Sequence, residues 1–396
     1  ENSSRTPFGY IIPPGIQREQ ANNTAFANVL QNEQALAMEV CGLPRGTAKG
    51  IYKNINFDLR LYEELEMFVH AEAVQDPDLQ NGDLALLLRL GSDFENNYYE
   101  YEVPLTISDT SNIPGYLEPE YKRRVWPVEN DIVLPLKELT NLKLERNAAS
   151  ASLNNFFTKK DPRNDKNIMR IIGNLSLGPL KGMMIGVVNR DTMIANTHCA
   201  EIWGNELRVS GLDERGGMAA IGRLDLKLAD FGDLTVAGEL ETIGFGGLEE
   251  KLQQRSRERK TQIDISTNLE LGKFFGDKSG IKIPMYAQYS KTVIRPEFDP
   301  YDKDVKLDDK LKAASSTEER NRIKDQALDV TELKSINFTN VRKNRTEKQA
   351  DKKPKPWNIE NFSVSYSYTE SDNRDPFIES DKVKEHNGSL NYSYSL

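Results

Sequence analysis

The side chains best suited to chemistry in this sequence do not complete a known catalytic or zinc site. His70-Ala-Glu72 has the His-x-Glu spacing of zinc deaminases, but the Pro-Cys-x-x-Cys that supplies the other zinc ligands is missing. His198-Cys199 places a base beside a thiol, yet the sequence offers no obvious third residue to orient the imidazole. With three histidines and two cysteines in 396 residues, there is little material for a zinc site.

Calcium and nucleotide motifs also fail on spacing. Four aspartates lie between residues 299 and 308, without the Gly and the closing Glu of a calcium-binding helix–loop–helix. Gly244-Phe-Gly-Gly247 begins like a dinucleotide fingerprint, but the third glycine is absent and Glu249-Glu250 would repel a pyrophosphate. We therefore predict that the chain is not an enzyme and that it holds no cofactor and no metal.

Composition narrows the class of protein further. The chain carries 61 acidic and 52 basic side chains, a formal net charge of −9, so we expect no nucleic-acid partner. No apolar run approaches the roughly 18–20 residues of a membrane-spanning helix. The length favours two or three structural units. Residue 1 is Glu and no export segment follows it, so we expect an internal piece of a longer protein.

The first half of the chain has the pattern of a β-sandwich. Nine short β-type runs lie between Gln34 and Val209, separated by turn residues such as Asn81-Gly82-Asp83. Only residues 137–155 look helical or irregular. This pattern predicts an antiparallel sandwich of jelly-roll type over residues 25–210, preceded by a linker at 1–24.

Two features of this section leave alternatives open. Tyr98-Tyr99-Glu100-Tyr101, beside the polar loop 91–97, could form a sugar-stacking platform, although strand alternation directs at least one pair of these side chains into the core. Cys41 and Cys199 lie in the first and last strands of the section and could form a disulfide in an oxidising compartment. Two buried thiols are the alternative.

From Gly216 onward, apolar and polar residues alternate almost strictly. In Gln262–Leu271 the odd positions are apolar or Thr and the even positions are polar. The same alternation appears in Arg223–Leu228, Leu234–Glu241, Ile281–Tyr289, Phe362–Thr369 and Ser389–Leu396. Strands of roughly 8–11 residues can cross an outer membrane when tilted, so we expect residues 211–396 to supply transmembrane-type strands of a very large β-barrel.

The apolar phase of this alternation predicts a lipid-facing band, formed by Leu224, Leu226, Ile263, Ile265, Leu269, Val364 and Tyr366. The polar phase, rich in Ser, Thr and Asn, suits a water-filled lumen. Short connections such as 272–280 alternate with long ones such as 244–260 and 296–358, which favours a barrel whose two rims differ in loop length. A soluble antiparallel sheet with one solvated face has the same period and is the alternative.

The longest connection, 296–358, is strongly charged. Asp302–Lys334 has balanced charge and helical spacing, so we expect a solvated helical insertion. Arg342–Pro356 carries seven basic and two acidic residues and predicts either a solvated face or a contact with anionic headgroups or a partner. The contact candidates are Lys348, Lys352, Lys353 and Lys355.

Several stretches carry a resemblance to a known family. They are Tyr52–Arg60, Met67–Glu72, Arg89–Asp93, Asn97–Tyr101, Leu212–Gly217, Leu226–Phe231, Gly244–Gly246, Gln254–Glu258, Glu270–Phe274 and Ile283–Met285. The most specific is Glu201-Ile-Trp-Gly-Asn-Glu-Leu-Arg208. In these segments the chain resembles the SprA/Sov family, the giant outer-membrane translocon of the type IX secretion system of Bacteroidota, which also serves gliding motility.

The resemblance implies a very large single-chain β-barrel that passes folded secreted cargo proteins across the bacterial outer membrane, with periplasmic or surface-exposed portions. It implies as partners the cargo, a shuttle barrel of PorV type, a plug protein and outer-membrane lipid. The expected function is therefore a segment of a protein-conducting translocon. The alternative is a surface-anchored carbohydrate-binding sandwich with an attached soluble β-domain.

Overall fold

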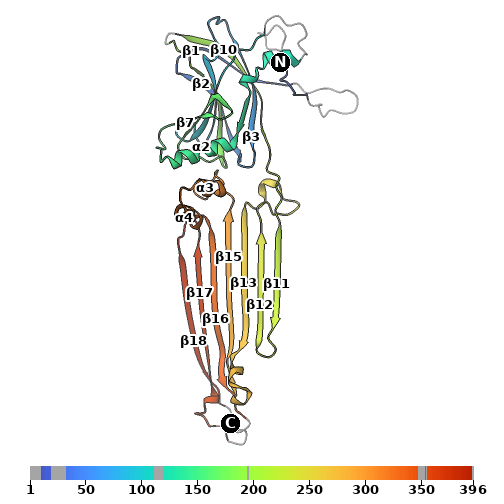
Figure 1. Cartoon of the computed structure of the whole chain (residues 1–396), viewed down its shortest axis with the longest axis vertical. Coiled ribbons are helices and arrows are strands. Elements are labelled where there is room, and N and C mark those ends of the chain that lie inside the picture. Colours follow the sequence, from blue (N-terminus) through green and yellow to red (C-terminus); the bar gives the residue numbers. More distant parts are fainter. Residues whose placement is uncertain are drawn as a thin grey trace, which may run out of the picture. The chain divides into compact units, whose positions relative to one another are not determined.

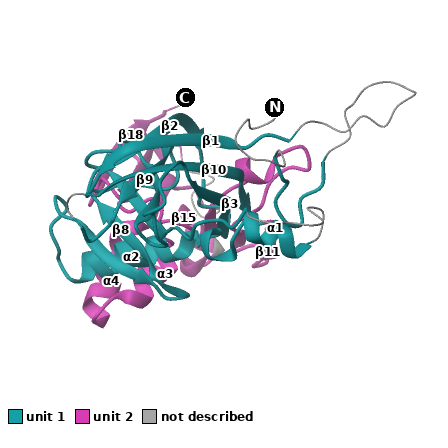
Figure 2. Cartoon of the chain, turned by 90° about the horizontal axis from the view of Figure 1, so that it is seen from above, with its two compact units in different colours: residues 1–213 teal, residues 214–396 magenta. Residues whose placement is uncertain are grey.

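The computed structural model describes residues 10–18, 33–110, 119–193, 196–346, 353 and 355–394. The chain divides into two compact units, Glu1–Asp213 and Glu214–Leu396 (Figure 2). Both units consist mainly of antiparallel strands, which confirms the predicted all-β class. Among the described residues, no helix has the length and apolar character needed to cross a membrane.

Unit 1 contains two antiparallel sheets. The four-stranded sheet has the order β1 (Leu36–Pro44), β10 (Thr197–Ser210), β3 (Glu64–Ala73) and β6 (Ile132–Pro135). The six-stranded sheet has the order β2 (Ala48–Phe57), β9 (Leu180–Asn189), β4 (Leu84–Gly91), β5 (Tyr98–Pro104), β8 (Asn164–Ile172) and β7 (Phe157–Asp161). One hydrophobic core contains residues of both sheets, so the unit is a sandwich.

The core forms because alternate side chains of the strands point to the same side. In β3, Leu65, Met67, Val69 and Ala71 are all buried and belong to the main core. Strand β4 is central in its sheet and is apolar on both faces, as expected for a strand covered on each side.

Two helices lie within the described part of unit 1. Helix α2 (Leu136–Ala148) contributes Leu136, Leu139 and Leu142 to the main core, because a spacing of three residues keeps them on one helix face. Helix α1 (Pro119–Val125) buries Tyr121 and Val125 in a second cluster around two tryptophans. A short 3₁₀ turn, Val128–Asn130, follows α1.

The proposed sugar-stacking platform is wrong. Tyr98, Tyr99, Glu100 and Tyr101 are between 1% and 4% exposed. Strand β5 lies between β4 and β8, so both of its edges are paired. Its two faces are also covered: Tyr99 and Tyr101 enter the core, and Tyr98 lies under the guanidinium of Arg89. No aromatic face is available there for a sugar.

Unit 2 is one open antiparallel sheet in which sequential long strands are neighbours (Figure 1). The strands are β11 (Ala219–Lys227), β12 (Gly232–Glu241), β13 (Glu258–Glu270), β15 (Pro284–Pro296), β16 (Asp329–Lys343), β17 (Phe362–Arg374) and β18 (Asp381–Tyr392), with the short β14 (Ile281–Lys282) paired to β16. Short 3₁₀ turns occur at Leu252–Gln254, Leu271–Phe275, Asp277–Ser279 and Ile359–Asn361.

The single long loop expected at 296–358 is also wrong, because β16 lies inside it and pairs with β15 and β17 along most of its length. The helical insertion is shorter than expected: α3 (Leu307–Ala313) and α4 (Thr317–Ala327) precede β16. Charged residues Glu332 and Lys334 occupy the apolar phase of β16 and conceal its alternation in the sequence.

This extra strand changes the pattern of connections. The first four alternate between short (228–231 and 271–283) and long (242–257 and 297–328). The last two connections reverse this alternation, because the fifth connection (344–361) is longer than the sixth (375–380). The expected difference between the two rims therefore holds only for the first part of the sheet.

Candidate functional site

The strand register brings all seven candidate lipid-facing residues to one face of the unit 2 sheet. Residues paired directly across antiparallel strands project to the same side. The row Leu224–Val236–Ile265–Tyr289 therefore shares a face with the row Leu269–Met285–Phe338–Tyr366, since each strand repeats with period two. Leu226, Ile263 and Val364 have the same phase. We call this side the apolar face.

The apolar face is exposed in the described structure. Leu224 is 54% exposed, Ile263 48% and Val364 47%. A continuous apolar surface of this kind is unusual on a protein that has only water around it and marks a contact with lipid or with another apolar surface.

The opposite side, which we call the polar face, carries hydroxyl, amide and charged groups. One row across the whole sheet reads Asp225, Thr235, Ser266, Gln288, Ser335, Thr369 and Glu385. In β17, Ser363, Ser365, Ser367, Thr369 and Ser371 occupy this phase in succession. The sheet thus presents two chemically different surfaces at the same time.

The apolar band crosses the sheet obliquely. On β11 and β12 the apolar band extends up to the paired residues Ala220 and Leu240. Followed across the sheet, this row of paired residues reaches Arg374 on β17. On β17, however, the apolar band already ends at Tyr368, six residues before Arg374. At about 3.3 Å per residue and about 4.8 Å per strand, this edge slopes at roughly 40–45° to the normal of the strands. Strands that cross a membrane in a barrel tilt by about 35–45°.

Ion pairs mark the edge of this band on β16 to β18. Lys382 Nζ lies 2.7 Å from Glu370 and 3.5 Å from Asp372, and Lys334 Nζ lies 3.2 Å from Glu332. All are in the apolar phase of their strands. Because such a network belongs in water or among headgroups, it sets a limit on how far the apolar band extends.

Aromatic side chains mark the other edge. Phe362 at the start of β17 and Tyr392 at the end of β18 have ring centroids 5.1 Å apart. Phe231, in the turn after β11, and Phe274, in the 3₁₀ turn after β13, have ring centroids 5.0 Å apart. Trp357, which precedes Phe362 by five residues, is 74% exposed. Aromatic residues are enriched at membrane–water interfaces.

Two of the four basic contact candidates belong to this aromatic edge. Lys353 and Lys355 are exposed, and Lys355 Nζ lies 5.7 Å from the ring centroid of Trp357. The carbonyl of Pro356 accepts hydrogen bonds from Asn361 and from the Tyr392 hydroxyl, which fixes this segment to the end of the sheet. Lys348 and Lys352 lie outside the described residues.

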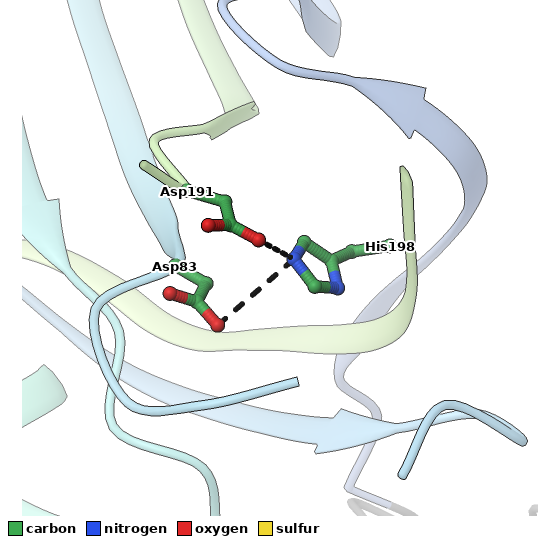
Figure 3. Close-up of side chains that lie close together, drawn as sticks. All are labelled: Asp83, Asp191 and His198. Atoms are coloured by element: carbon green, nitrogen blue, oxygen red, sulfur yellow. Dashed lines mark hydrogen bonds and ion pairs between the residues drawn. The ribbon is translucent and has the colours of Figure 1, made fainter. Parts of the chain in front are cut away.

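Cys41 and Cys199 in unit 1 are joined by a disulfide between β1 and β10, with Cα atoms 4.0 Å apart. The neighbouring residue, His198, is 2% exposed. It lies beside two aspartates that Figure 3 shows around its ring, Asp83 and Asp191. His198 Nε2 is 3.0 Å from Asp191 Oδ2 and 3.9 Å from Asp83 Oδ2.

The third residue that the sequence did not reveal is Asp76, which follows β3. Asp76 Oδ2 lies 3.0 Å from His198 Nδ1 and accepts a hydrogen bond from the backbone N–H of Cys199. It therefore orients the imidazole and is the third residue that was not obvious from the sequence. Burial lowers the pKa of His198, but hydrogen bonds to Asp76 and Asp191 outweigh burial and raise that pKa above its ordinary value.

The strand ends around His198 hold its carboxylate partners firmly. Asp191 accepts hydrogen bonds from Met193 N and Asn196 Nδ2, and its own N–H donates to the buried Asn189. These bonds lower the pKa of Asp191 to about 2, with the bond from Met193 as the largest cause. Asp83 Oδ2 accepts from Gln80 N. In the sequence, this cluster is indicated only by the polar turn segments that precede β4 and follow β9.

Comparison with known proteins identifies a family. A family model, SprA_N, described as "Motility related/secretion protein", matches residues 1–311, which include all of unit 1 and the sheet from β11 through β15. Among curated proteins, none matches the chain.

Proposed function

The chain belongs to the SprA_N family of motility-related and secretion proteins, and we propose that it forms part of the wall of an outer-membrane translocon that exports folded cargo proteins. In this proposal unit 2 is a portion of a very large β-barrel. The observation that carries it is the oblique apolar band, because a lipid layer that meets tilted strands produces such a slope.

The two faces of the sheet then have distinct roles. The apolar face contacts lipid hydrocarbon, with the aromatic edge at one interface and the ion pairs near the other. The polar face lines the lumen, where Ser, Thr and Asn side chains keep a hydrated surface that binds folded cargo weakly. No residue of this wall needs to perform chemistry, in keeping with a conducting rather than an enzymatic role.

The barrel must contain more strands than this sheet. Strands β11 and β18 are the edges of the sheet, and unpaired backbone groups at an edge are costly in hydrocarbon. We therefore propose that other strands pair with both edges. A shuttle barrel of PorV type and a plug protein are the partners that the family resemblance proposes for the completed pore.

For unit 1 we propose a jelly-roll topology. The order β1-β10-β3-β6 in one sheet faces β2-β9-β4-β5 in the other. Among these eight strands, successive strands change sheet at every step except the β4–β5 hairpin, which is the pattern of a jelly roll. The hairpin β7–β8 extends the second sheet. A carbohydrate-binding role for this unit loses its main support, because the tyrosine cluster is buried.

The proposal is tested by locating the intact protein and probing the two faces. We expect the full-length protein to fractionate with outer membranes. In the variants Val364→Cys and Ser365→Cys, a membrane-impermeant maleimide should label the second and spare the first, because Val364 faces lipid and Ser365 faces water. The native cysteines are joined in a disulfide and do not interfere. Recovery of native protein in the soluble fraction, or equal labelling of both variants, would reject the proposal.

A further inference from the structure

We propose that Asp83, Asp191 and His198 of unit 1 bind a divalent transition-metal cation, with Zn²⁺ as its best representative. The ligand atoms of the three side chains lie within 4.8 Å of one another. Ligands that share one zinc ion at about 2.0–2.2 Å lie roughly 3–4 Å apart. The observed separations of 3.0 and 3.9 Å from Nε2 match this spacing after a small rotation of Asp83, the most exposed of the three.

The imidazole is already oriented for a metal. Its Nδ1 faces Asp76 Oδ2 and its Nε2 faces Asp191 Oδ2, each at 3.0 Å, and because carboxylates only accept, both nitrogens donate when no metal is bound. A metal would replace the Nε2 proton and bind the Nε2 lone pair, which is directed at Asp191 and Asp83, while Nδ1–H continues to donate to Asp76. A carboxylate that holds the distal nitrogen of a metal-binding histidine is the usual outer partner of such a ligand. His198 is 98% buried, which fixes the direction of that lone pair.

Charge supplies the second, independent argument. Three carboxylates converge on His198, and in the described part of the chain none of them has a Lys or Arg nitrogen within ion-pair distance. A protonated imidazole would balance only one of three negative charges. Asp191 is buried, and the side chains of Asp76 and Asp83 are only 12% and 22% exposed. Uncompensated negative charge is costly at such sites, and a divalent cation removes the imbalance.

Another acidic cluster in the same chain shows the contrasting solution. Asp299 is 2% exposed, and its Oδ1 lies 3.0 Å from Lys310 Nζ, which also lies 2.9 Å from Asp302. There the protein supplies its own cation. Around His198, by contrast, the described residues supply no Lys or Arg within ion-pair distance of the three aspartates, and a protonated imidazole offsets only one of their charges.

The ligand chemistry selects the class of metal. One imidazole nitrogen with two carboxylate oxygens suits Zn²⁺ and its first-row neighbours, whereas Ca²⁺ and Mg²⁺ prefer oxygen alone. Asp83 is only partly buried, so water can supply a fourth ligand. The ligands come from the start of β4, the end of β9 and the start of β10, which belong to different sheets. The ion therefore joins the two sheets beside the Cys41–Cys199 disulfide.

Metal content and affinity of the purified full-length protein test the proposal. Prepared without chelator, it should contain about one transition-metal ion per chain, and EDTA should lower the melting temperature of unit 1 in a way that Zn²⁺ reverses. Asp83→Asn should lower the affinity for Zn²⁺ by about 10–100-fold in a chelator competition, without lowering the melting temperature of the metal-free protein. His198→Gln should abolish binding. His386→Gln, in exposed β18, is the matched control and should bind Zn²⁺ normally.

The alternative is a metal-free clamp in which a protonated His198 bridges Asp76 and Asp191. It predicts no bound metal, no effect of EDTA or Zn²⁺ on the melting temperature, and identical Zn²⁺ competition for the wild type and Asp83→Asn. Any of these results would overturn the proposal. Because Asp83→Asn removes a ligand but keeps every contact between His198, Asp76 and Asp191, a misfolded His198→Gln variant would leave the test intact.

Discussion

Glu102, on β5, is a nearly buried carboxylate held between two guanidinium groups. Arg190 Nη2 lies 2.7 Å from it, and Arg170 donates a second charged hydrogen bond. Arg170 also binds Glu100, which is 2.7 Å from Arg89, so the charges form a continuous network on the six-stranded sheet. Burial raises the pKa of Glu102, but the bonds from Arg190 and Arg170 outweigh it and lower that pKa below its ordinary value.

Replacing Glu102 with Gln should destabilise unit 1 by roughly 2 kcal/mol at neutral pH, less than the loss of a fully buried partner, because Arg190 is partly exposed. Because the folded pKa is lowered, the contribution of Glu102 is present above the ordinary Glu pKa and disappears as the pH falls through the lowered value. Urea unfolding of wild type and variant should therefore converge in acid. The exposed Glu95→Gln is the control, and a difference that persisted in acid would contradict this account.

At the scale of elements, β17 shows how one strand serves two environments. Val364 and Tyr366 lie on the apolar face, and Ser365 and Ser367 lie on the polar face. A bulge in β16 after Phe338 keeps Val341 opposite Val364, so the apolar phase continues past the irregularity.

An arginine on each face of β17 should have unequal effects. Val364→Arg puts a charge toward lipid and should cost roughly 2–4 kcal/mol near mid-bilayer, less if Val364 lies close to the interface, whereas Ser365→Arg should cost little because its side chain stays in water. The measurement is the amount of folded protein that reaches the outer membrane. Greater damage from Ser365→Arg would reverse the assignment of the two faces.

The segment that contains α3 and α4 is a small folded element rather than a free solvated loop. Val305, Leu307, Ala327 and Leu328 are between 1% and 7% exposed, and Lys310 binds two aspartates. Its helices therefore depend on a few buried contacts and one buried charge.

Lys310→Met should loosen this segment, because it leaves Asp299 buried beside Asp302 without their shared cation. We expect faster cleavage by a Glu-specific protease at Glu318 and Glu319, with no change in the amount of assembled protein. Lys312→Met is the matched control, since its side chain is 78% exposed. Equal protection in both variants would mean that Lys310 does not hold the segment together.

At the scale of the whole molecule, unit 1 has the features of an independent domain. It contains its own core, a disulfide and a second cluster in which Trp126 and Trp203 have ring centroids 6.2 Å apart. Trp126 is fully buried, and its Nε1 donates to the carbonyl of Ile11.

We predict that residues 25–210 fold alone as a soluble monomer. The isolated segment should give a near-UV circular dichroism signal from the two tryptophans and a cooperative melt. Because Ile11 lies outside that segment, adding residues 1–24 should raise the melting temperature. A flat near-UV spectrum from both lengths would show that unit 1 depends on unit 2.

The sequence alone determined the family and the chemistry of the faces. Strict alternation in β13 and β17 identifies the apolar and polar phases because side chains of a strand alternate sides whatever its neighbours are. It also located most strands of unit 1, since turn residues separate them. These are local properties, and local properties can be read from consecutive residues.

Only the tertiary structure decided the features that depend on neighbours. Strand β16 was not predicted because Glu332 and Lys334 interrupt the apolar phase of its sequence. These two charges are tolerated there because Lys334 forms ion pairs with Glu332 and with Glu370. Likewise, Asp76, Asp83 and Asp191 reach His198 from three separate strand ends, and Asp76 is 122 residues away in the chain. Contacts of this kind form only when the two sheets close on a common core, so their physical basis lies in the fold and not in spacing along the chain.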